Sequence, residues 1–154
     1  MTKKALVLSS GGCDSTTCVG IAVERFGAEN VATVSFRYGQ KHAKELECAE
    51  KVAEHYGVGH RVINFDGCGI FDGSTCSLLS GSGKGIDHES YAEQIAKNGE
   101  GMVSTYVPFR NGLFLATLAA VAMSEFPEDE AYLYIGAHAD DAAGDAYADC
   151  SEAF

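Results

Sequence analysis

The sequence predicts an α/β fold, a doubly wound parallel sheet with helices on both faces. Three observations support this prediction. Apolar runs of strand length alternate with amphipathic segments of helix length, which is the pattern of consecutive βαβ units. The first apolar run is followed by two serines, two glycines and a helix-like segment. The chain has 154 residues, 46% of them apolar, which fits a single domain over residues 1–154.

The first half of the chain follows the order strand, helix, strand, helix, strand. Short apolar or β-branched runs predict strands buried in a parallel sheet, and apolar residues at helical spacing predict the helices. The predicted strands span residues 5–8, 31–36 and 60–65, and the predicted helices span residues 14–26 and 40–56. Gly27 and Gly57 stand where the two helices should end, because glycine readily adopts the left-handed conformation of a helix C-terminus.

The second half is less regular. Residues 66–104 are rich in glycine and serine, with one short helix at most over 88–97, and they predict either a lid or binding loop or a disordered segment. The predicted helix over 113–126 is apolar almost all round, so it should be buried on more than one side. It would lie under the sheet or against a second subunit, which makes a homodimer plausible. A fourth strand is expected over residues 131–135.

The charge and the cysteine content of the chain indicate which partners and which cellular compartment to expect. The formal net charge of −11 repels nucleic acid and anionic lipid, so we expect neither a nucleic-acid partner nor a membrane. No run approaches the roughly 18 consecutive apolar residues of a membrane span. The six cysteines include no C-x-x-C pair, which favours free thiols and a cytoplasmic location. His55, His60 and His88 are expected at the surface.

A glycine-rich turn between the first strand and the first helix carries the strongest chemical signal. Two adjacent glycines let successive N–H groups face one anion, and the helix N-terminus adds unpaired donors and a positive dipole end. The turn therefore predicts a phosphate-binding site; the alternative is an ordinary Gly-Gly turn capped by Asp14. Asp14 would repel phosphate, so it should act as an N-cap or hold Mg²⁺. The candidate site comprises Ser9, Ser10, Gly11, Gly12, Cys13, Asp14, Ser15, Thr16 and Thr17.

This turn matches neither of the two commonest phosphate-binding motifs. Elsewhere in the chain, Gly83-Lys84-Gly85 lacks the first glycine and the hydroxyl residue of G-x-x-x-x-G-K-[ST]. The adjacent glycines of the turn do not fit G-x-G-x-x-G. It resembles the S-G-G-x-D-S signature of the PP-loop ATP pyrophosphatases. That resemblance implies a Rossmann-like sheet of the adenine nucleotide alpha hydrolase type and cleavage of ATP between its α and β phosphates.

Four later segments resemble one branch of that superfamily. They are Tyr38-Gly39-Gln40-Lys41-His42, Val107-Pro108-Phe109-Arg110-Asn111, residues 136–141 and residues 147–154. With the turn, they are similar to the 7-cyano-7-deazaguanine synthases of queuosine biosynthesis. The resemblance implies an ATP-dependent carbon–nitrogen ligase. Such an enzyme converts 7-carboxy-7-deazaguanine and ammonia to the nitrile through an adenylated intermediate and an amide.

Roles for individual residues follow from this resemblance and from local chemistry. The catalytic candidates are Asp14, Ser15, Lys41 and Arg110; the substrate candidates are Arg110, Asn111, Asp140, Asp141, Tyr147 and Asp149; the metal candidates are Asp14 and Asp141. A cation such as Arg110 is unfavourable at a helix start unless an anion neutralises it, which supports a phosphate or carboxylate ligand over a surface salt bridge.

Several of these residues also have simpler interpretations. Lys41 and His42 could be solvated residues of a first helical turn, and either Asp140 or Asp141 could lie in a solvated turn at the end of a strand. Asp149 would either accept hydrogen bonds from a guanine-like base or cap a turn.

The chain departs from the resembled family in its cysteines. That family carries a structural zinc on a C-terminal cysteine cluster, whereas these 154 residues hold no four cysteines at zinc-ligand spacing. We expect either a truncated form or a protein that dispenses with zinc. Two other functions stay open: another PP-loop enzyme, such as a tRNA thiolase or lysidine synthetase, and a nucleotide-binding module without turnover.

Overall fold

The computed structural model describes residues 1–41, 44–83, 93, 96–97, 103–138, 141–142 and 147–154. The described chain forms a parallel sheet of four strands in the order β3-β2-β1-β4. The strands are β1 (Lys3–Leu8), β2 (Val31–Arg37), β3 (Gly59–Asn64) and β4 (Glu130–Tyr134). The main helices are α1 (Cys13–Phe26), α2 (Lys44–Tyr56) and α4 (Arg110–Glu125), and short 3-10 helices span Ala28–Asn30, Ser80–Ser82 and Ala148–Cys150.

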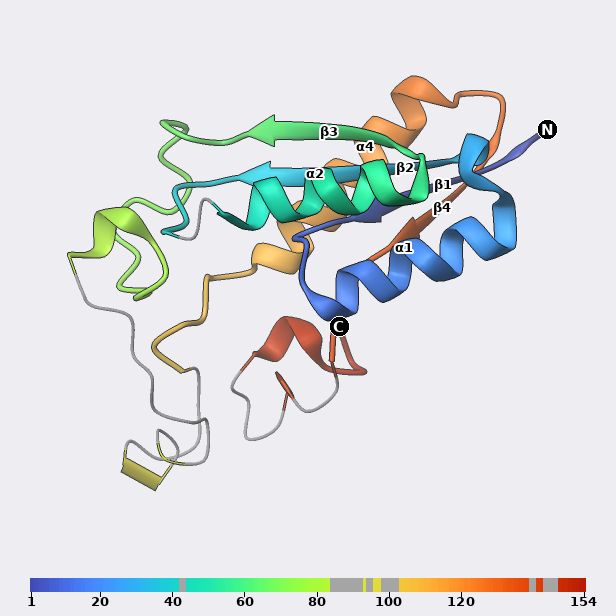
Figure 1. Ribbon diagram of the computed structural model, residues 1–154. Helices are drawn as coiled ribbons and strands as arrows, with labels where there is room; N and C mark the ends of the chain where they lie inside the picture. Colours follow the sequence, from blue (N-terminus) through green and yellow to red (C-terminus); the bar gives the residue numbers. More distant parts are fainter. Residues whose placement is uncertain (42–43, 84–92, 94–95, 98–102, 139–140, 143–146) are drawn as a thin grey trace.

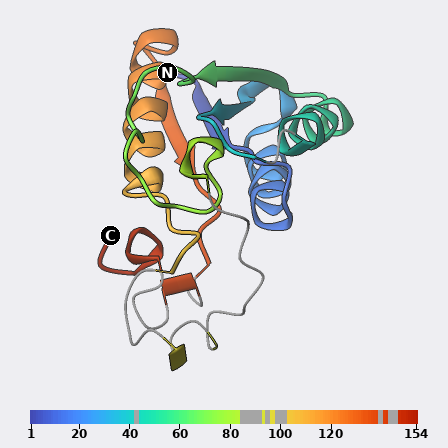
Figure 2. The ribbon, with the colours of Figure 1, turned by 90° about the vertical axis from the view of Figure 1, so that its left-hand side faces the viewer.

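Helices cover both faces of the sheet, as predicted: α1 and α2 lie on one side and α4 on the other (Figures 1 and 2). The chain builds the sheet outwards from β1 through β2 to β3, and then places β4 on the opposite side of β1. The strand order therefore reverses between β1 and β4. In open parallel sheets, ligands bind at the carboxyl ends of the strands beside such a reversal.

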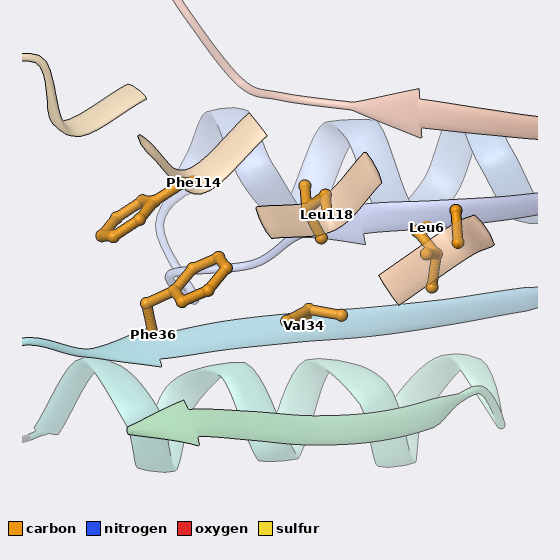
Figure 3. Close-up of a cluster of buried hydrophobic side chains, with 6 residues drawn as sticks. Leu6, Val34, Phe36, Phe114 and Leu118 are labelled. Carbon is orange, nitrogen blue, oxygen red and sulfur yellow. The ribbon is translucent and has the colours of Figure 1, made fainter. Parts of the chain in front are cut away.

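The core has two layers because alternate residues of a strand point to opposite faces. Leu6 on β1 and Phe36 on β2 pack against Phe114 and Leu118 of α4 (Figure 3). On the other face, Val7 belongs to a cluster with residues of α1. Since β1 is covered on both faces, it must be apolar at every core position, which explains its unbroken apolar run.

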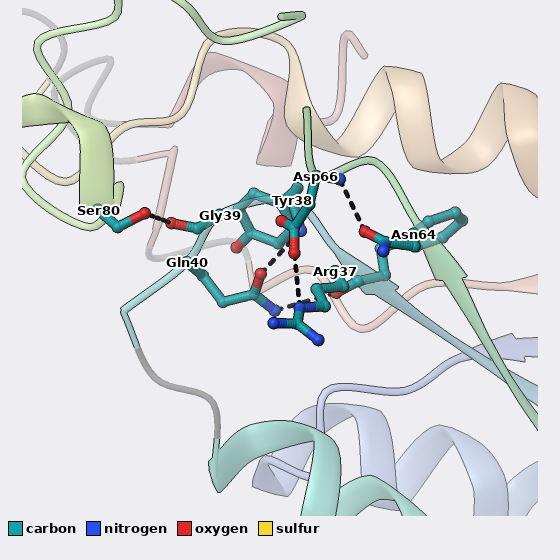
Figure 4. Close-up of polar contacts among 8 residues, drawn as sticks. Arg37, Tyr38, Gly39, Gln40, Asn64, Asp66 and Ser80 are labelled. Atoms are coloured by element: carbon teal, nitrogen blue, oxygen red, sulfur yellow. Dashed lines mark hydrogen bonds and ion pairs between the residues drawn. The ribbon is translucent and has the colours of Figure 1, made fainter. Parts of the chain in front are cut away.

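The observed ends of α1 agree with the prediction from the sequence, whereas the start of α2 does not. Gly27 ends α1 with a φ of 80°, and Gly57 follows α2 with a φ of 67°. The prediction that the second helix begins at Gln40 was wrong, because α2 begins at Lys44. Gln40 instead bonds back to β2: its side-chain amide accepts from the Tyr38 N–H and donates to the Phe36 carbonyl, at 2.9 and 3.0 Å (Figure 4).

The described part of the irregular segment, residues 66–83, packs against the end of β2. Gln40 and Leu79 form an antiparallel bridge, and the Lys41 N–H donates to the Leu78 carbonyl at 3.0 Å. Cys76 and Leu79 are buried with Val107. This part therefore forms a wall beside the end of β2, and its role as a lid or binding loop stays a prediction. The short helix predicted over 88–97 lies mostly outside the described residues.

Two contacts tie this wall to the neighbouring strands (Figure 4). Arg37 at the end of β2 forms an ion pair of 2.6 Å with Asp66, which follows β3. Ser80 donates from both its backbone N–H and its hydroxyl to the Gly39 carbonyl, each at 2.8 Å. The wall is thus fixed at both ends, beside the carboxyl ends of β2 and β3.

Helix α4 is buried on one side only within the described chain. Phe114, Leu118 and Ala122 face the sheet, whereas Met123 is 77% exposed. The described residues do not bury α4 on more than one side, and burial against a second subunit stays a prediction. No helix in the described residues is both long and apolar enough to cross a bilayer.

His60 on β3 is less exposed than the sequence suggests. Its Nδ1 lies 2.8 Å from the Thr33 hydroxyl, and its Nε2 is buried without a partner among the described residues. Burial lowers the pKa of His60 below its usual value, and nearby Glu50 offsets this only in part.

Because its folded-state pKa is depressed, His60 should make stability depend on pH. Protonation favours the unfolded chain, so stability should be fully present above the unfolded pKa of about 6.5 and lost as the pH falls through the lower folded value. Urea unfolding at pH 8, 6 and 5 should show this decline, and His60→Gln should reduce it. An unchanged pH dependence in the variant would exclude His60 as its source.

Candidate nucleotide-binding site

A pocket of about 200 Å³ lies at the carboxyl ends of β1, β2 and β4. Its walls come from the turn after β1, the ends of β2 and β4, and the starts of α2 and α4. It is lined by Leu8, Ser9, Ser10, Ser15, Phe36, Tyr38, Gln40, Glu45, Leu46, Leu78, Arg110, Asn111, Phe114, Ile135 and Gly136. The pocket therefore occupies the position beside the strand-order reversal at which parallel sheets bind ligands.

The glycine-rich turn forms one end of this pocket. Helix α1 begins at Cys13 with Gly12 as its N-cap and without a side-chain cap. The buried Ser15 hydroxyl donates to the Gly12 carbonyl at 3.1 Å and accepts from the Ser10 N–H at 3.2 Å. These bonds hold the turn in a tight curl while backbone donors at the start of α1 stay uncapped, as an anion-binding helix end requires.

Ser9 supplies a further polar group at this end. It is only 1% exposed, and its hydroxyl has no partner among the described residues. Its backbone is fixed, because its N–H donates to the Val34 carbonyl at 2.9 Å and its carbonyl accepts from the Ser35 hydroxyl at 2.5 Å. Burying a hydroxyl without a partner costs free energy, and Ser9 lies in the wall of the pocket.

The N-terminus of α4 forms the opposite end of the pocket. The residue before the helix, Phe109, has a left-handed φ of 51° and offers no side-chain cap. The cap comes instead from Asp149, whose Oδ2 accepts from the Asn111 N–H at 2.9 Å. The Asn111 side-chain amide donates in turn to the Asp149 carbonyl at 3.1 Å and to the Cys150 sulfur at 3.3 Å. The C-terminal segment thereby holds the start of α4.

Arg110 carries the cation at this end of the pocket. Its Nη1 lies 3.4 Å from the Tyr38 hydroxyl. Burial lowers the pKa of the guanidinium, but Tyr38 and the carboxylate of Asp149 outweigh this, so the net shift is upwards. For the Tyr38 hydroxyl, burial raises the pKa, and the nearby guanidinium of Arg110 offsets this only in part. The pair is therefore a fixed positive charge beside a neutral hydroxyl.

The structure brings some of the predicted site residues together and places others elsewhere. Ser9, Ser10, Ser15, Arg110 and Asn111 all line the pocket. Gly11, Gly12, Cys13, Thr16 and Thr17 belong to the same turn and first helical turn, and the Thr17 hydroxyl donates to the Cys13 carbonyl at 2.9 Å.

The remaining candidates lie off the lining of this pocket. The Lys41 ammonium donates to the Ser77 carbonyl at 2.7 Å, Tyr147 bonds the Thr105 hydroxyl, and Asp149 caps α4. Asp14 is an exposed residue of the first turn of α1. The interpretation of Asp14 as the N-cap was wrong, since Gly12 takes that position. His42 and Asp140 lie outside the described residues.

Sequence reasoning assigned no role to several residues that shape the pocket. Phe36, Tyr38 and Phe114 form an aromatic wall, with the rings of Phe36 and Phe114 stacked 4.2 Å apart between centroids. Gly136 lies against the start of α1, where a Cβ atom would come within 3.0 Å of the backbone of Asp14 and Ser15. The glycine directly after a strand was the available signal for this close approach.

The metal candidates do not form a complete protein site. No group of three or more His, Cys, Asp or Glu side chains that could hold a metal comes together in the described part of the chain. Mg²⁺ beside a nucleotide needs only one or two carboxylates in addition to phosphate oxygens and water. Asp14, at the start of α1, and Asp141, after β4, stay predicted ligands of such an ion. A zinc site of four ligands has no such set among the described residues.

The sheet order and the position of the pocket together define an α/β domain of the Rossmann-like class. Within this class, the chain belongs to the family described as "Queuosine biosynthesis protein QueC", whose profile matches residues 4–154. The resemblance of its motifs to the 7-cyano-7-deazaguanine synthases is thereby confirmed.

Curated relatives agree with this family assignment, and each carries the name 7-cyano-7-deazaguanine synthase. The chain is 37% identical to the protein of Chromobacterium violaceum over 150 residues, which cover 97% of the chain and 58% of the relative. It is 41% identical to the protein of Rhodopirellula baltica over 152 residues, which cover 98% and 55%. The chain thus spans less than two thirds of the length of these relatives.

Proposed function

We propose that this chain carries the ATP-binding and activating part of a 7-cyano-7-deazaguanine synthase. It would use ATP and ammonia to convert 7-carboxy-7-deazaguanine to the nitrile, in queuosine biosynthesis. The observation that carries the proposal is a single pocket bounded by two helix N-termini, the glycine-rich turn of α1 and Arg110 of α4. Both ends favour anions, as a polyphosphate and a carboxylate require.

The proposed reaction activates the same carbon twice. An oxygen of the substrate carboxylate attacks the α-phosphorus of ATP, and pyrophosphate leaves. Ammonia then adds to the acyl carbon, and AMP leaves together with a proton to give the amide. In the second activation the amide oxygen attacks the α-phosphorus of another ATP, and pyrophosphate leaves again. Loss of AMP and of the remaining N–H protons gives the nitrile.

The protein would contribute mainly orientation and charge. The backbone of the turn, with Ser9, Ser10, Ser15, Thr16 and Thr17, would hold the polyphosphate, and preorganised donors of this kind need no rearrangement during reaction. Arg110 would stabilise the negative charge that develops on the reacting oxygens. Asp14 and Asp141 would hold Mg²⁺, which would neutralise the phosphates.

The other candidates have weaker support. Lys41 was proposed for charge stabilisation, yet its ammonium bonds the Ser77 carbonyl, so it would first serve to fix the wall of the pocket. Asn111, Asp140, Asp141 and Tyr147 stay proposed contacts of the deazaguanine. Asp149 would act by holding α4. A cytoplasmic location, a homodimer, and the absence of nucleic-acid and membrane partners stay predictions.

The family match favours this function over another PP-loop enzyme that modifies tRNA. A nucleotide-binding module without turnover is the remaining alternative. One assay separates the two: AMP is measured after incubation of the chain with Mg-ATP, ammonium and 7-carboxy-7-deazaguanine. We expect AMP only when the deazaguanine is present. ATP binding without AMP would support the binding module and contradict the synthase.

A further inference from the structure

Tyr38 is held rigidly at the Arg110 end of the pocket. Its ring packs edge-on against Phe114 and Phe71, with centroids 5.3 and 5.9 Å apart. Its backbone N–H donates to the Gln40 side chain at 2.9 Å. Packing on two sides and a fixed backbone leave the hydroxyl little freedom, which is the preorganisation that a catalytic donor needs.

The Tyr38 hydroxyl and the Arg110 guanidinium together have more hydrogen-bond donors than acceptor atoms. The Tyr38 oxygen accepts from Arg110 Nη1 at 3.4 Å, near the upper limit for such a bond. Because Arg110 is the donor in this bond, the bond does not use the hydroxyl hydrogen of Tyr38. A tyrosine hydroxyl is protonated at neutral pH, and burial raises the pKa of Tyr38 further. Both side chains line the same pocket, and so can donate to one ligand.

A carboxylate matches this pair chemically. Its two oxygens accept several hydrogen bonds, and a planar guanidinium beside a neutral hydroxyl offers charge and donors on one side. A phosphate would suit the turn of α1 better, where backbone donors are uncapped. The two ends of the pocket therefore favour different anions.

We propose that Tyr38 is a further catalytic residue, whose hydroxyl and the Arg110 guanidinium together bind the carboxylate of the substrate during its activation. This inference rests on the proposed function. The two donors would hold one oxygen of the carboxylate while the other attacks the α-phosphorus. They would also select the acid over an analogue that lacks the 7-substituent.

The test compares binding of 7-carboxy-7-deazaguanine and of unsubstituted 7-deazaguanine by calorimetry. Tyr38→Phe removes only the hydroxyl. It should weaken binding of the acid about 10- to 100-fold, as for loss of a hydrogen bond to a charged group, and leave the unsubstituted compound unaffected. The matched control is Tyr132→Phe, which removes a hydroxyl that bonds Glu130 at the surface and should change neither affinity.

Three outcomes would count against this inference, and they differ from one another. If Tyr38→Phe leaves the preference of the wild type for the acid intact, the Tyr38 inference is wrong and the proposed function stands. If the variant binds both compounds equally more weakly, Tyr38 only supports the pocket wall. If the wild type binds neither compound, the proposed function itself fails.

Discussion

Replacing Gly11 by alanine should lower the free energy of unfolding and abolish nucleotide binding. Gly11 has a φ of 75°, and a Cβ atom there would lie 2.5 Å from the Cys48 Cβ and 2.6 Å from the Ala49 nitrogen. These atoms belong to α2, so a helix would have to move. The left-handed conformation costs alanine about 1–2 kcal/mol and overpacking a further ~1–3 kcal/mol. Urea unfolding should report a loss of about 2–5 kcal/mol, and ATP binding should be lost with the curl of the turn.

The adjacent glycine provides the matched control. Gly12 has an extended backbone with φ −81° and ψ 172°, and the nearest atom to an added Cβ would be the Ser10 Oγ at 3.4 Å. Gly12→Ala should therefore lose less than about 1 kcal/mol. Equal losses in the two variants would show that close packing against α2 does not explain the need for glycine at position 11.

The fold could be predicted from the sequence because its strongest constraints are local. The buried strand β1 must be apolar on both faces, and Gly27 marks a helix end by its own conformation. The predicted start of α2 was wrong because Gln40 has a helical propensity, whereas tertiary contacts hold it outside the helix in the structure. Its partners, Phe36 and Leu79, include one from a segment that no periodicity identifies. Tertiary contacts commonly override such weak propensities.

The site was only partly predictable, for the same reason. Residues of the turn act through their own backbone, so their spacing was sufficient. The partner of Arg110 was not visible, since Tyr38 lies 72 residues away along the chain. Lys41 and Asp149 were selected for their charge, yet the structure gives each a bond to the backbone of a distant segment. The chemistry of the side chains identified candidate residues of the site. The fold determines whether each of them faces a ligand or stabilises the wall of the pocket.

Asp149 provides the second large expected effect, a loss of stability that begins at α4. Only 4% of this residue is exposed, and its carboxylate accepts from the Asn111 N–H at a helix start that has no cap of its own. Asp149→Ala would leave that buried N–H without a partner and remove a negative charge that raises the pKa of Arg110. Loss of a buried hydrogen bond to a charged group costs about 1.5–3 kcal/mol, and urea unfolding should show a decrease of that size.

Two further variants separate the cap from the charge. Asp149→Asn keeps an acceptor oxygen for the Asn111 N–H, so it should retain most of the stability. It should lose mainly the electrostatic effect of the carboxylate on Arg110. Glu152→Ala removes an exposed carboxylate from the same segment and should change stability by less than about 0.5 kcal/mol. If the alanine and asparagine variants of Asp149 lose the same amount, charge outweighs capping. If Asp149→Ala is as stable as Glu152→Ala, the C-terminal segment does not hold α4, and Arg110 is positioned by Tyr38 and its own helix.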